Sequence, residues 1–310
     1  MFVRVRPRSH GVIAIGLLVA GVVLSACNAP AATPTNKILG VGAENQYANV
    51  ISQIGGRFVS VDAVMSNPNT DPHTFEASTS VAQAIASAKL VVQNGVGYDT
   101  FMEQLESSAP SSSRRVIDVQ TLLGLSLNTK NPHLWYAPTT MPVVATRIAQ
   151  DLSSIAPTHA AYFKQRLASF LASLHGVDVA IKNFKARFSG DDVATTEPVA
   201  DYLLAALGLH NVTPFRFQAD IMNGVDPSPE DIAFQQNLLT SHQAKVFCYN
   251  EQVSSTVTLA MRSLAQSSHV PVVAVYETMP TGFNYQTWML AEIAALSKAL
   301  TSHLSTKELS

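Results

Sequence analysis

The chain lacks several features on which many enzymes and nucleic-acid-binding proteins depend. It has only two cysteines, Cys27 and Cys248. The H-E-x-x-H, G-x-S-x-G and P-loop patterns are all missing, as is any close cluster of cysteine and histidine, which argues against the common hydrolase and nucleotide-binding classes. The chain has 20 basic and 22 acidic residues, and this charge balance argues against a nucleic-acid partner.

The N-terminus has the pattern of a secretion signal. Three arginines precede a wholly apolar run over residues 11–24. This run is shorter than the about 20 apolar residues that a spanning helix needs. It ends at Leu24-Ser25-Ala26-Cys27, which resembles the lipobox of bacterial lipoproteins. We therefore predict a signal peptide over residues 1–26, with an uncleaved anchor helix as the alternative.

Acylation is predicted at Cys27, followed by a flexible tether that extends to residue 36, because Ala, Pro, Thr and Asn dominate this segment. Cys248 then has no disulfide partner, and the folded part must be stabilised by its core. The three arginines leave with the signal, so 17 of the 20 basic residues remain against 22 acidic ones. We expect an extracytoplasmic protein that is lipid-anchored to the membrane, in a periplasm or on a cell surface.

Short apolar runs rich in β-branched residues alternate with longer helical patterns, which is typical of parallel sheets covered by helices. These runs predict an α/β fold of two lobes, each with a four-stranded parallel sheet flanked by helices. The N-terminal lobe is assigned to residues 37–154 and the C-terminal lobe to 189–310. The predicted strands are 38–41, 59–64, 90–96 and 115–118 in the first lobe and 193–195, 212–217, 245–249 and 270–276 in the second.

One long helix is predicted to join the lobes over residues 155–188. Apolar residues recur there at steps of three and four, which is the helical period. Gly176 lowers the stability of such a helix by up to about 1 kcal/mol relative to alanine, so a bend or two shorter helices stay open. Elsewhere, Ser228 before Pro229 predicts a helix start, and a last helix is predicted over 285–303.

Four residues with metal-binding side chains follow predicted strands. His73 follows the second strand, His133 lies beyond the fourth, Glu197 follows the fifth and Glu277 ends the eighth. Ligands of open α/β sheets bind beyond the carboxyl ends of the strands. Two neutral imidazoles and two carboxylates match the number and charge that a divalent cation requires. Taken singly, each residue also has a simpler explanation, as a surface histidine or as an acid at a helix start.

Several short segments along the chain match a known family pattern. They are Gly42-Ala43-Glu44-Asn45, Asp71-Pro72-His73, Asn94-Gly95-Val96-Gly97-Tyr98-Asp99, Asn131-Pro132-His133, Glu197-Pro198 and Glu277-Thr278-Met279-Pro280. Together they resemble the zinc- and manganese-binding lipoproteins of bacterial ABC importers, over nearly all of the chain that follows the signal. The resemblance implies one metal ion in a cleft between two lobes joined by a rigid helix. It also implies that His73, His133, Glu197 and Glu277 are the ligands.

Two departures from the family pattern bear on the metal. Zinc-selective members often have a histidine as third ligand and a histidine-rich loop in the first lobe, whereas this chain has Glu197 and no histidine over residues 105–131. Glu277 stands where aspartate is common. Two carboxylates favour manganese or iron, while zinc binds most N/O sites more tightly than manganese. The expected cargo is one divalent transition metal, either zinc or manganese, with iron as a further alternative.

Three asparagines, Asn67, Asn131 and Asn250, are candidate partners for the ligands, since metal-bound imidazoles usually donate their other N–H to an oxygen. The remaining histidines of the folded part are predicted to face solvent. Cys248 lies within a predicted strand and is interpreted as a small buried thiol.

The leading interpretation is a monomeric binding protein, not an enzyme, that captures the metal outside the cytoplasmic membrane and delivers it to the permease of an ABC importer. A binding protein of the same architecture for an organic metal chelate is the first alternative, and a metallohydrolase is the less favoured second. Four protein ligands would leave zinc no open position for water. A role in cell adhesion, which is attributed to some surface lipoproteins of this kind, has no support from particular residues.

Overall fold

The computed structural model describes residues 37–67 and 75–309. Residues 37–310 group into one compact unit. The predicted signal peptide, the tether with Cys27 and the candidate ligand His73 lie outside the described residues, and the lobe boundaries drawn from the sequence stay predictions. Within the described ranges, no helix is both long enough and apolar enough to cross a membrane.

The first sheet has four parallel strands in the order β2-β1-β3-β4. The central strands β1 and β3 are mostly buried, as expected for a parallel sheet that is covered on both faces. The strands are β1 (Ile38–Glu44), β2 (Val59–Met65), β3 (Leu90–Gln93) and β4 (Arg115–Asp118).

The second sheet repeats this order, as β6-β5-β7-β8, and is also parallel. Thr306 pairs with the outer edge of β8, because Ala274 N donates to Thr306 O at 2.9 Å and Thr306 N donates to Val272 O at 2.8 Å. The strands are β5 (Asp192–Thr195), β6 (His210–Asn211), β7 (Val246–Asn250) and β8 (Val272–Val275). The predicted α/β class with two four-stranded parallel sheets is confirmed.

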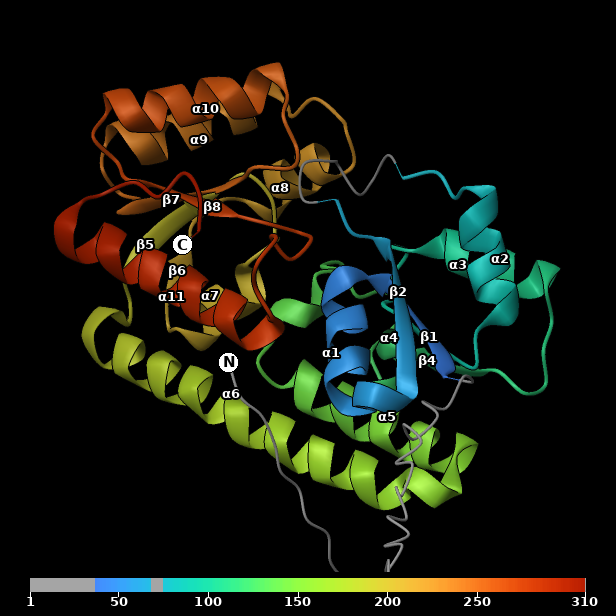
Figure 1. The fold of residues 1–310 in the computed structure, drawn as a ribbon. Coiled ribbons are helices and arrows are strands. Elements are labelled where there is room, and N and C mark those ends of the chain that lie inside the picture. Colours follow the sequence, from blue (N-terminus) through green and yellow to red (C-terminus); the bar gives the residue numbers. More distant parts are fainter. Residues whose placement is uncertain (1–36, 68–74, 310) are drawn as a thin grey trace, which may run out of the picture. The chain divides into compact units, whose positions relative to one another are not determined.

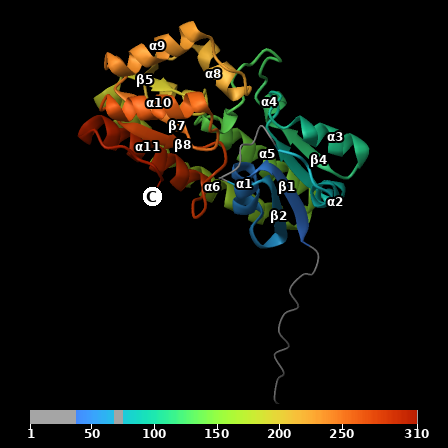
Figure 2. The ribbon, with the colours of Figure 1, turned by 90° about the horizontal axis from the view of Figure 1, so that it is seen from above.

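Helices cover both faces of each sheet (Figures 1 and 2). In the first lobe, by which we mean the elements around the first sheet, α1 and α5 lie on one face and α2 and α3 on the other. In the second lobe, α9 and α10 lie opposite α11. The helices are α1 (Asn45–Gly55), α2 (Thr79–Ser87), α3 (Thr100–Ser108), α4 (Val119–Leu122), α5 (Thr140–Ile155), α7 (Asp201–Ala206), α8 (Phe215–Met222), α9 (Pro229–Thr240), α10 (Thr256–Ser267) and α11 (Tyr285–Ser302).

The two lobes are joined by α6 (Ala160–Phe188), an uninterrupted helix of 29 residues. The prediction of one long joining helix is confirmed, although α5 ends at Ile155 and a 3₁₀ turn, η4 (Pro157–His159), precedes α6. α6 contacts α1 and α5 of the first lobe and α11 of the second (Figure 1). Gly176 does not break the helix. It faces open space, since a Cβ there would meet no atom within 4 Å.

The predicted strand over residues 212–217 is wrong. β6 is only His210–Asn211, and α8 already begins at Phe215. Pro214 lacks an N–H for a strand ladder and instead directly precedes the helix. Phe217 and Ile221 are buried together, at the spacing of four that places residues on one helical face. Phe215 and Phe217, two of the apolar residues that suggested a strand, belong to the first turn of α8.

The remaining predicted strands are present, with ends displaced by at most three residues. The predicted helix start at Ser228 is also confirmed, because the Ser228 side chain accepts from Asp231 N and Pro229 opens α9. The last helix ends at Ser302, and His303 follows it in the left-handed conformation.

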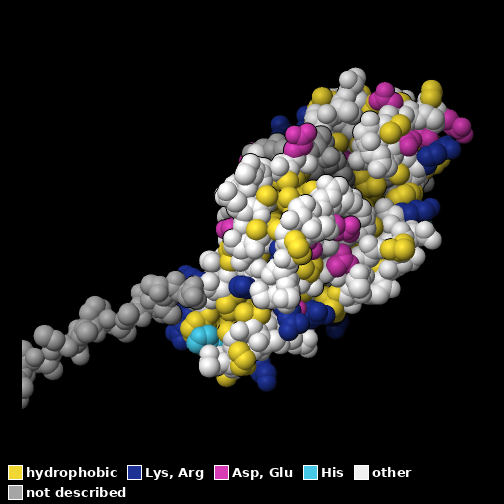
Figure 3. All heavy atoms as spheres, turned by 90° about the vertical axis from the view of Figure 1, so that its right-hand side faces the viewer, with side chains coloured by type: hydrophobic (Ala, Val, Ile, Leu, Met, Phe, Trp, Pro, Cys, Tyr) yellow, Lys and Arg dark blue, Asp and Glu magenta, His cyan; other side chains and the backbone are white. Residues whose placement is uncertain are grey.

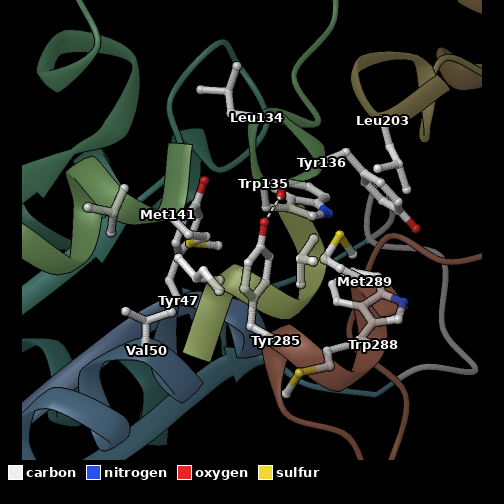
Figure 4. Close-up of a cluster of buried hydrophobic side chains, with 14 of the residues drawn as sticks. Tyr47, Val50, Leu134, Trp135, Tyr136, Met141, Leu203, Tyr285, Trp288 and Met289 are labelled. Atoms are coloured by element: carbon white, nitrogen blue, oxygen red, sulfur yellow. Dashed lines mark hydrogen bonds between the residues drawn. The ribbon is translucent and has the colours of Figure 1, made fainter. Parts of the chain in front are cut away.

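Aromatic side chains from both lobes share one continuous apolar core (Figure 4). Trp135 and Tyr136 of the first lobe are fully buried beside Tyr285 and Trp288 of α11. The Tyr285 hydroxyl donates to Trp135 O at 2.8 Å, which satisfies its polar end within this core (Figure 4). The lobes are therefore packed against each other and not only connected by α6.

The surface carries charges of both signs. On the face shown in Figure 3, Lys and Arg side chains are interspersed with Asp and Glu side chains and with neutral groups. Neither sign dominates this face, in keeping with the near-neutral balance of the sequence.

Two glycines give a matched test of the fold. In β1, a Cβ on Gly42 would lie 2.8 Å from Ala48 Cα of α1, whereas a Cβ on Gly176 would meet nothing. We expect Gly42→Ala to lower the free energy of unfolding by roughly 1–3 kcal/mol through overpacking. Gly176→Ala should raise it by about 0.5–1 kcal/mol. Thermal unfolding followed by circular dichroism checks both, and equal melting temperatures would contradict the close packing of α1 on β1.

Candidate metal centre

Polar residues at the carboxyl ends of the strands meet where the lobes adjoin. Asn250 ends β7, Glu197 follows β5 by two residues, and Glu277 follows β8 by two residues. His133 lies in the first lobe, immediately before the short helix η3 (Leu134–Tyr136). Ligands of open α/β folds bind at these sheet edges. All four side chains are buried, with at most 2% of their surface exposed.

The loop that carries His133 is fixed from both lobes. Asn94 Nδ2 donates to Pro132 O at 2.8 Å. Asn131 Oδ1 accepts from His133 N at 3.0 Å and lies 2.8 Å from His133 Nδ1. Across the lobes, Asn131 Nδ2 donates to Pro198 O at 2.7 Å. Because the carbonyl can only accept, the Asn131 amide has one orientation, with its oxygen toward the imidazole.

This orientation determines the proton position on His133. Asn131 Oδ1 only accepts, so Nδ1 carries the proton and donates it. Nε2 then faces Glu277 Oε2, 3.3 Å away. An unprotonated ring nitrogen and a carboxylate oxygen would present lone pairs to each other in a fully buried place, which is unfavourable. The pair therefore requires a proton or another cation.

The second lobe supplies two carboxylates that share one amide donor. Asn250 Nδ2 donates to Glu197 Oε1 at 3.0 Å and to Glu277 Oε1 at 2.7 Å. Asn250 Oδ1 accepts from Gln252 N at 3.0 Å, which sets the direction of this amide. Two ionised carboxylates this close repel each other, and a neutral amide offsets only part of that repulsion. A divalent cation would compensate both charges.

Tyr98 crosses from the first lobe to Glu277. Its hydroxyl donates to Glu277 Oε2 at 2.8 Å. Burial, followed by the Glu277 carboxylate, raises the pKa of Tyr98 well above its usual value, so that the phenol stays a donor at neutral pH. Tyr98 also lines a groove of about 420 Å³ between the lobes, with Lys130 and Phe215 on its walls. The ring thus stands between this groove and the buried carboxylate.

The structure brings together His133, Glu197 and Glu277, three of the four residues predicted as ligands. His73 lies outside the described residues. Within the described ranges, no group of three or more His, Cys, Asp and Glu side chains has the arrangement of a metal site. The ligand set therefore stays a prediction.

The three candidate asparagines are placed differently. Asn131 and Asn250 contact the predicted ligands directly. Asn67 is exposed, and its backbone oxygen accepts from Thr278 Oγ1 at 3.5 Å. Cys248 is buried in β7, as predicted, and burial raises the pKa of its thiol.

Sequence reasoning missed Tyr98 and Gln252. Gln252 Oε1 accepts from Glu277 N at 2.6 Å and from Thr278 N at 2.8 Å, and so holds the backbone next to a predicted ligand. Tyr98 had a signal, because it lies in the segment after β3 that carries the family resemblance. A glutamine two residues after a strand has no distinctive pattern, and its role depends on a partner 25 residues away.

A further buried glutamate lies beneath the site, in α11. Glu292 Oε1 is 3.0 Å from Tyr136 Oη and accepts from Trp288 Nε1 at 3.1 Å. Tyr136 Oη also lies 2.8 Å from Tyr276 O. A protonated Glu292 can donate to Tyr136, which then donates to Tyr276 O. Burial raises the pKa of Glu292 to about 8, against the opposing effect of its hydrogen bonds with Tyr136 and Trp288.

Comparison with known proteins points to one family. A family model described as "ZnuA: Zinc-uptake complex component A periplasmic" matches residues 41–299. A putative metal-binding protein of Thermotoga maritima is 27% identical over 173 residues, which span 54% of this chain and 61% of the relative. The manganese ABC transporter substrate-binding lipoprotein PsaA of Streptococcus mitis is 22% identical over 277 residues, which span 83% of this chain and 86% of PsaA.

A solved structure has the same fold. The periplasmic zinc-binding protein TroA from Treponema pallidum matches with a TM-score of 0.72 at 19% sequence identity. The match covers 86% of this chain and 99% of TroA. It therefore includes both lobes and the helix between them.

The pKa of Glu292 leads to a prediction about pH. The unfolded chain ionises this group above about 4.5 and the folded chain only above about 8, so the neutral acid contributes stability that is lost as pH rises between these values. Glu292→Gln removes the titration. Relative to wild type, its free energy of unfolding should therefore rise by roughly 3 kcal/mol between pH 5 and pH 8.

Urea unfolding at several pH values measures this difference, with the exposed Glu103→Gln as a control for the loss of one carboxyl group. A difference between Glu292→Gln and wild type that stays constant from pH 5 to pH 8 would be the contrary result.

Proposed function

The chain belongs to the ZnuA family of periplasmic zinc-uptake components, and from this premise we propose that it captures one divalent transition metal ion and delivers it to an ABC importer. The proposed ligands are His73, His133, Glu197 and Glu277. We further propose that the protein acts as a carrier and has no catalytic role, since four protein ligands close a tetrahedral zinc site to water.

The contact between His133 Nε2 and Glu277 Oε2 carries this proposal. The Asn131 amide leaves Nε2 as the ring atom that faces the carboxylate, 3.3 Å away, and Glu197 adds a second carboxylate through Asn250. A neutral imidazole and two carboxylates are suitable ligands for zinc, manganese and iron. The same three groups would be poorly placed to bind an anion or an apolar molecule.

The ligand types bear on the choice of metal. Two carboxylates make the set harder than one rich in histidine, which favours manganese or iron. In solution, zinc is still expected to bind more tightly than manganese, since affinities for N/O sites follow the general order of the divalent metals. The supply of metal around the cell then decides which ion is carried.

Metal titration tests the proposal. We expect one ion per chain, and zinc at 100 times its Kd should raise the free energy of unfolding by about 2.7 kcal/mol. His133→Ala should weaken metal binding by more than about 100-fold. Removal of a group that only hydrogen-bonds a ligand typically costs about 10-fold to 100-fold, so a larger loss identifies His133 as a ligand itself. His175→Ala, which removes an exposed histidine of α6, should change nothing. Absence of stabilisation by zinc, manganese and iron alike would reject the proposal.

A lipid anchor at Cys27 is the second part of the proposal. Each buried methylene contributes about 0.8 kcal/mol to membrane attachment, so more than one acyl chain holds a protein stably. A tether then keeps the carrier at a high local concentration near a permease.

The anchor predicts a separation between binding and transport. Cys27→Ala should leave the metal affinity of the purified protein unchanged, shift the protein from the membrane fraction to the soluble fraction of cells, and reduce metal uptake. Fractionation and radioactive metal uptake measure these effects. Retention of the variant in the membrane fraction would favour an uncleaved helix instead.

A further inference from the structure

The backbone that carries Glu277 is held by side chains of the other lobe. Tyr136 Oη bonds both the carbonyl and the N–H of Tyr276, at 2.8 and 3.3 Å. Gln46 Nε2 donates to Glu277 O at 3.2 Å. Both Tyr136 and Gln46 belong to the first lobe, whereas this backbone continues β8 of the second.

Asn45 adds two further contacts to this backbone. Its Nδ2 donates to Met279 O at 2.8 Å, and its Oδ1 accepts from Met279 N at 2.8 Å. The side-chain amide thus pairs with both polar groups of one backbone residue, as a neighbouring strand would. From the second lobe itself, Gln252 Oε1 accepts from the N–H groups of Glu277 and Thr278.

Helix α1 can serve as a rigid support for these contacts. Tyr47, Val50, Ile51 and Ile54 are fully buried in the core of the first lobe. Asn45 and Gln46 occupy the first turn of the helix, on the side that meets Glu277 and Met279. Their amides therefore hold a fixed position relative to the first lobe, which also carries His133.

We propose that Asn45 and Gln46 are positioning residues that set the distance between Glu277 and His133 and thereby the affinity for the metal. This inference rests on the proposed function. Because of these contacts, the backbone of Glu277 should move together with the first lobe, although Glu277 follows a strand of the second lobe. Metal ligands must lie within about 0.5 Å of their productive positions, so a small shift of this backbone changes the binding geometry.

Gln46→Met separates positioning from stability. Gln46 is fully buried, and its Oε1 has no hydrogen-bond partner among the described residues. Methionine has a similar volume and removes this unsatisfied oxygen together with the bond to Glu277 O. The metal-free variant should melt at or above the temperature of wild type. Its affinity for zinc should nevertheless fall by roughly threefold to tenfold, the equivalent of one hydrogen bond.

Asn45→Ala removes two bonds to the same backbone and should weaken zinc binding by about tenfold or more. Asn49→Ala is the matched control. Asn49 lies one turn further along α1 and accepts from Tyr285 N, which lies outside the backbone segment from Tyr276 to Met279. Its loss should therefore leave the affinity for zinc unchanged. Competition with a chelator measures each affinity, and the visible absorption of bound Co²⁺ reports the ligand geometry.

The inference is supported if the Co²⁺ spectrum changes in Gln46→Met and Asn45→Ala but not in Asn49→Ala. It is overturned if both variants keep the wild-type affinity and spectrum, or if Asn49→Ala loses as much affinity as they do. Wild-type protein that binds none of zinc, manganese, iron and Co²⁺ would instead reject the proposed function itself, so the two failures are distinguishable.

Discussion

The buried contact between His133 and Glu277 depends on positive charge, and the surrounding groups preserve that dependence. Removal of a carboxylate from water costs several kcal/mol unless its charge is compensated. Among the described residues, the amide of Asn250 donates to both Glu197 and Glu277 and the hydroxyl of Tyr98 donates to Glu277, and both of these donors are neutral. They orient the oxygens without cancelling the charge. An arginine in place of Asn250 or Tyr98 would neutralise a carboxylate and so reduce the electrostatic free energy gained when a cation binds.

A site that binds a cation also needs fixed distances between its ligands, and the contacts between the lobes provide them. Asn131 reaches Pro198, and Tyr202 donates back to Asn131 O at 3.0 Å, so the loops of His133 and Glu197 are bonded to each other. The shared aromatic core lies directly behind these loops. A joining helix of 29 residues adds stiffness over a longer distance. These contacts favour small adjustments of the ligands over a wide opening of the lobes.

Local patterns predicted much of this arrangement. The alternation of apolar runs indicated both sheets, and the positions of His133, Glu197 and Glu277 after strands indicated a common edge. The prediction of a strand over Val212 to Phe217 was wrong because apolar residues beside a proline fit a short strand as well as a helix start. Asn45 and Gln46 could not be assigned at all. Their partners lie 234 and 231 residues away, so only the tertiary fold reveals that these amides support the Glu277 backbone.

The contrast between Glu277 and Glu292 shows why burial alone does not identify a metal ligand. Both are fully buried glutamates of the second lobe, and each lies beside a tyrosine hydroxyl. Glu292 lies beside two neutral groups, Tyr136 and Trp288, and a single proton neutralises it, in agreement with a pKa of about 8. Glu277 instead faces the acceptor side of an imidazole and shares an amide with a second carboxylate. One proton cannot serve three acceptors at once, whereas a divalent cation can, and it is this excess of converging acceptors that distinguishes the candidate ligand from the structural acid.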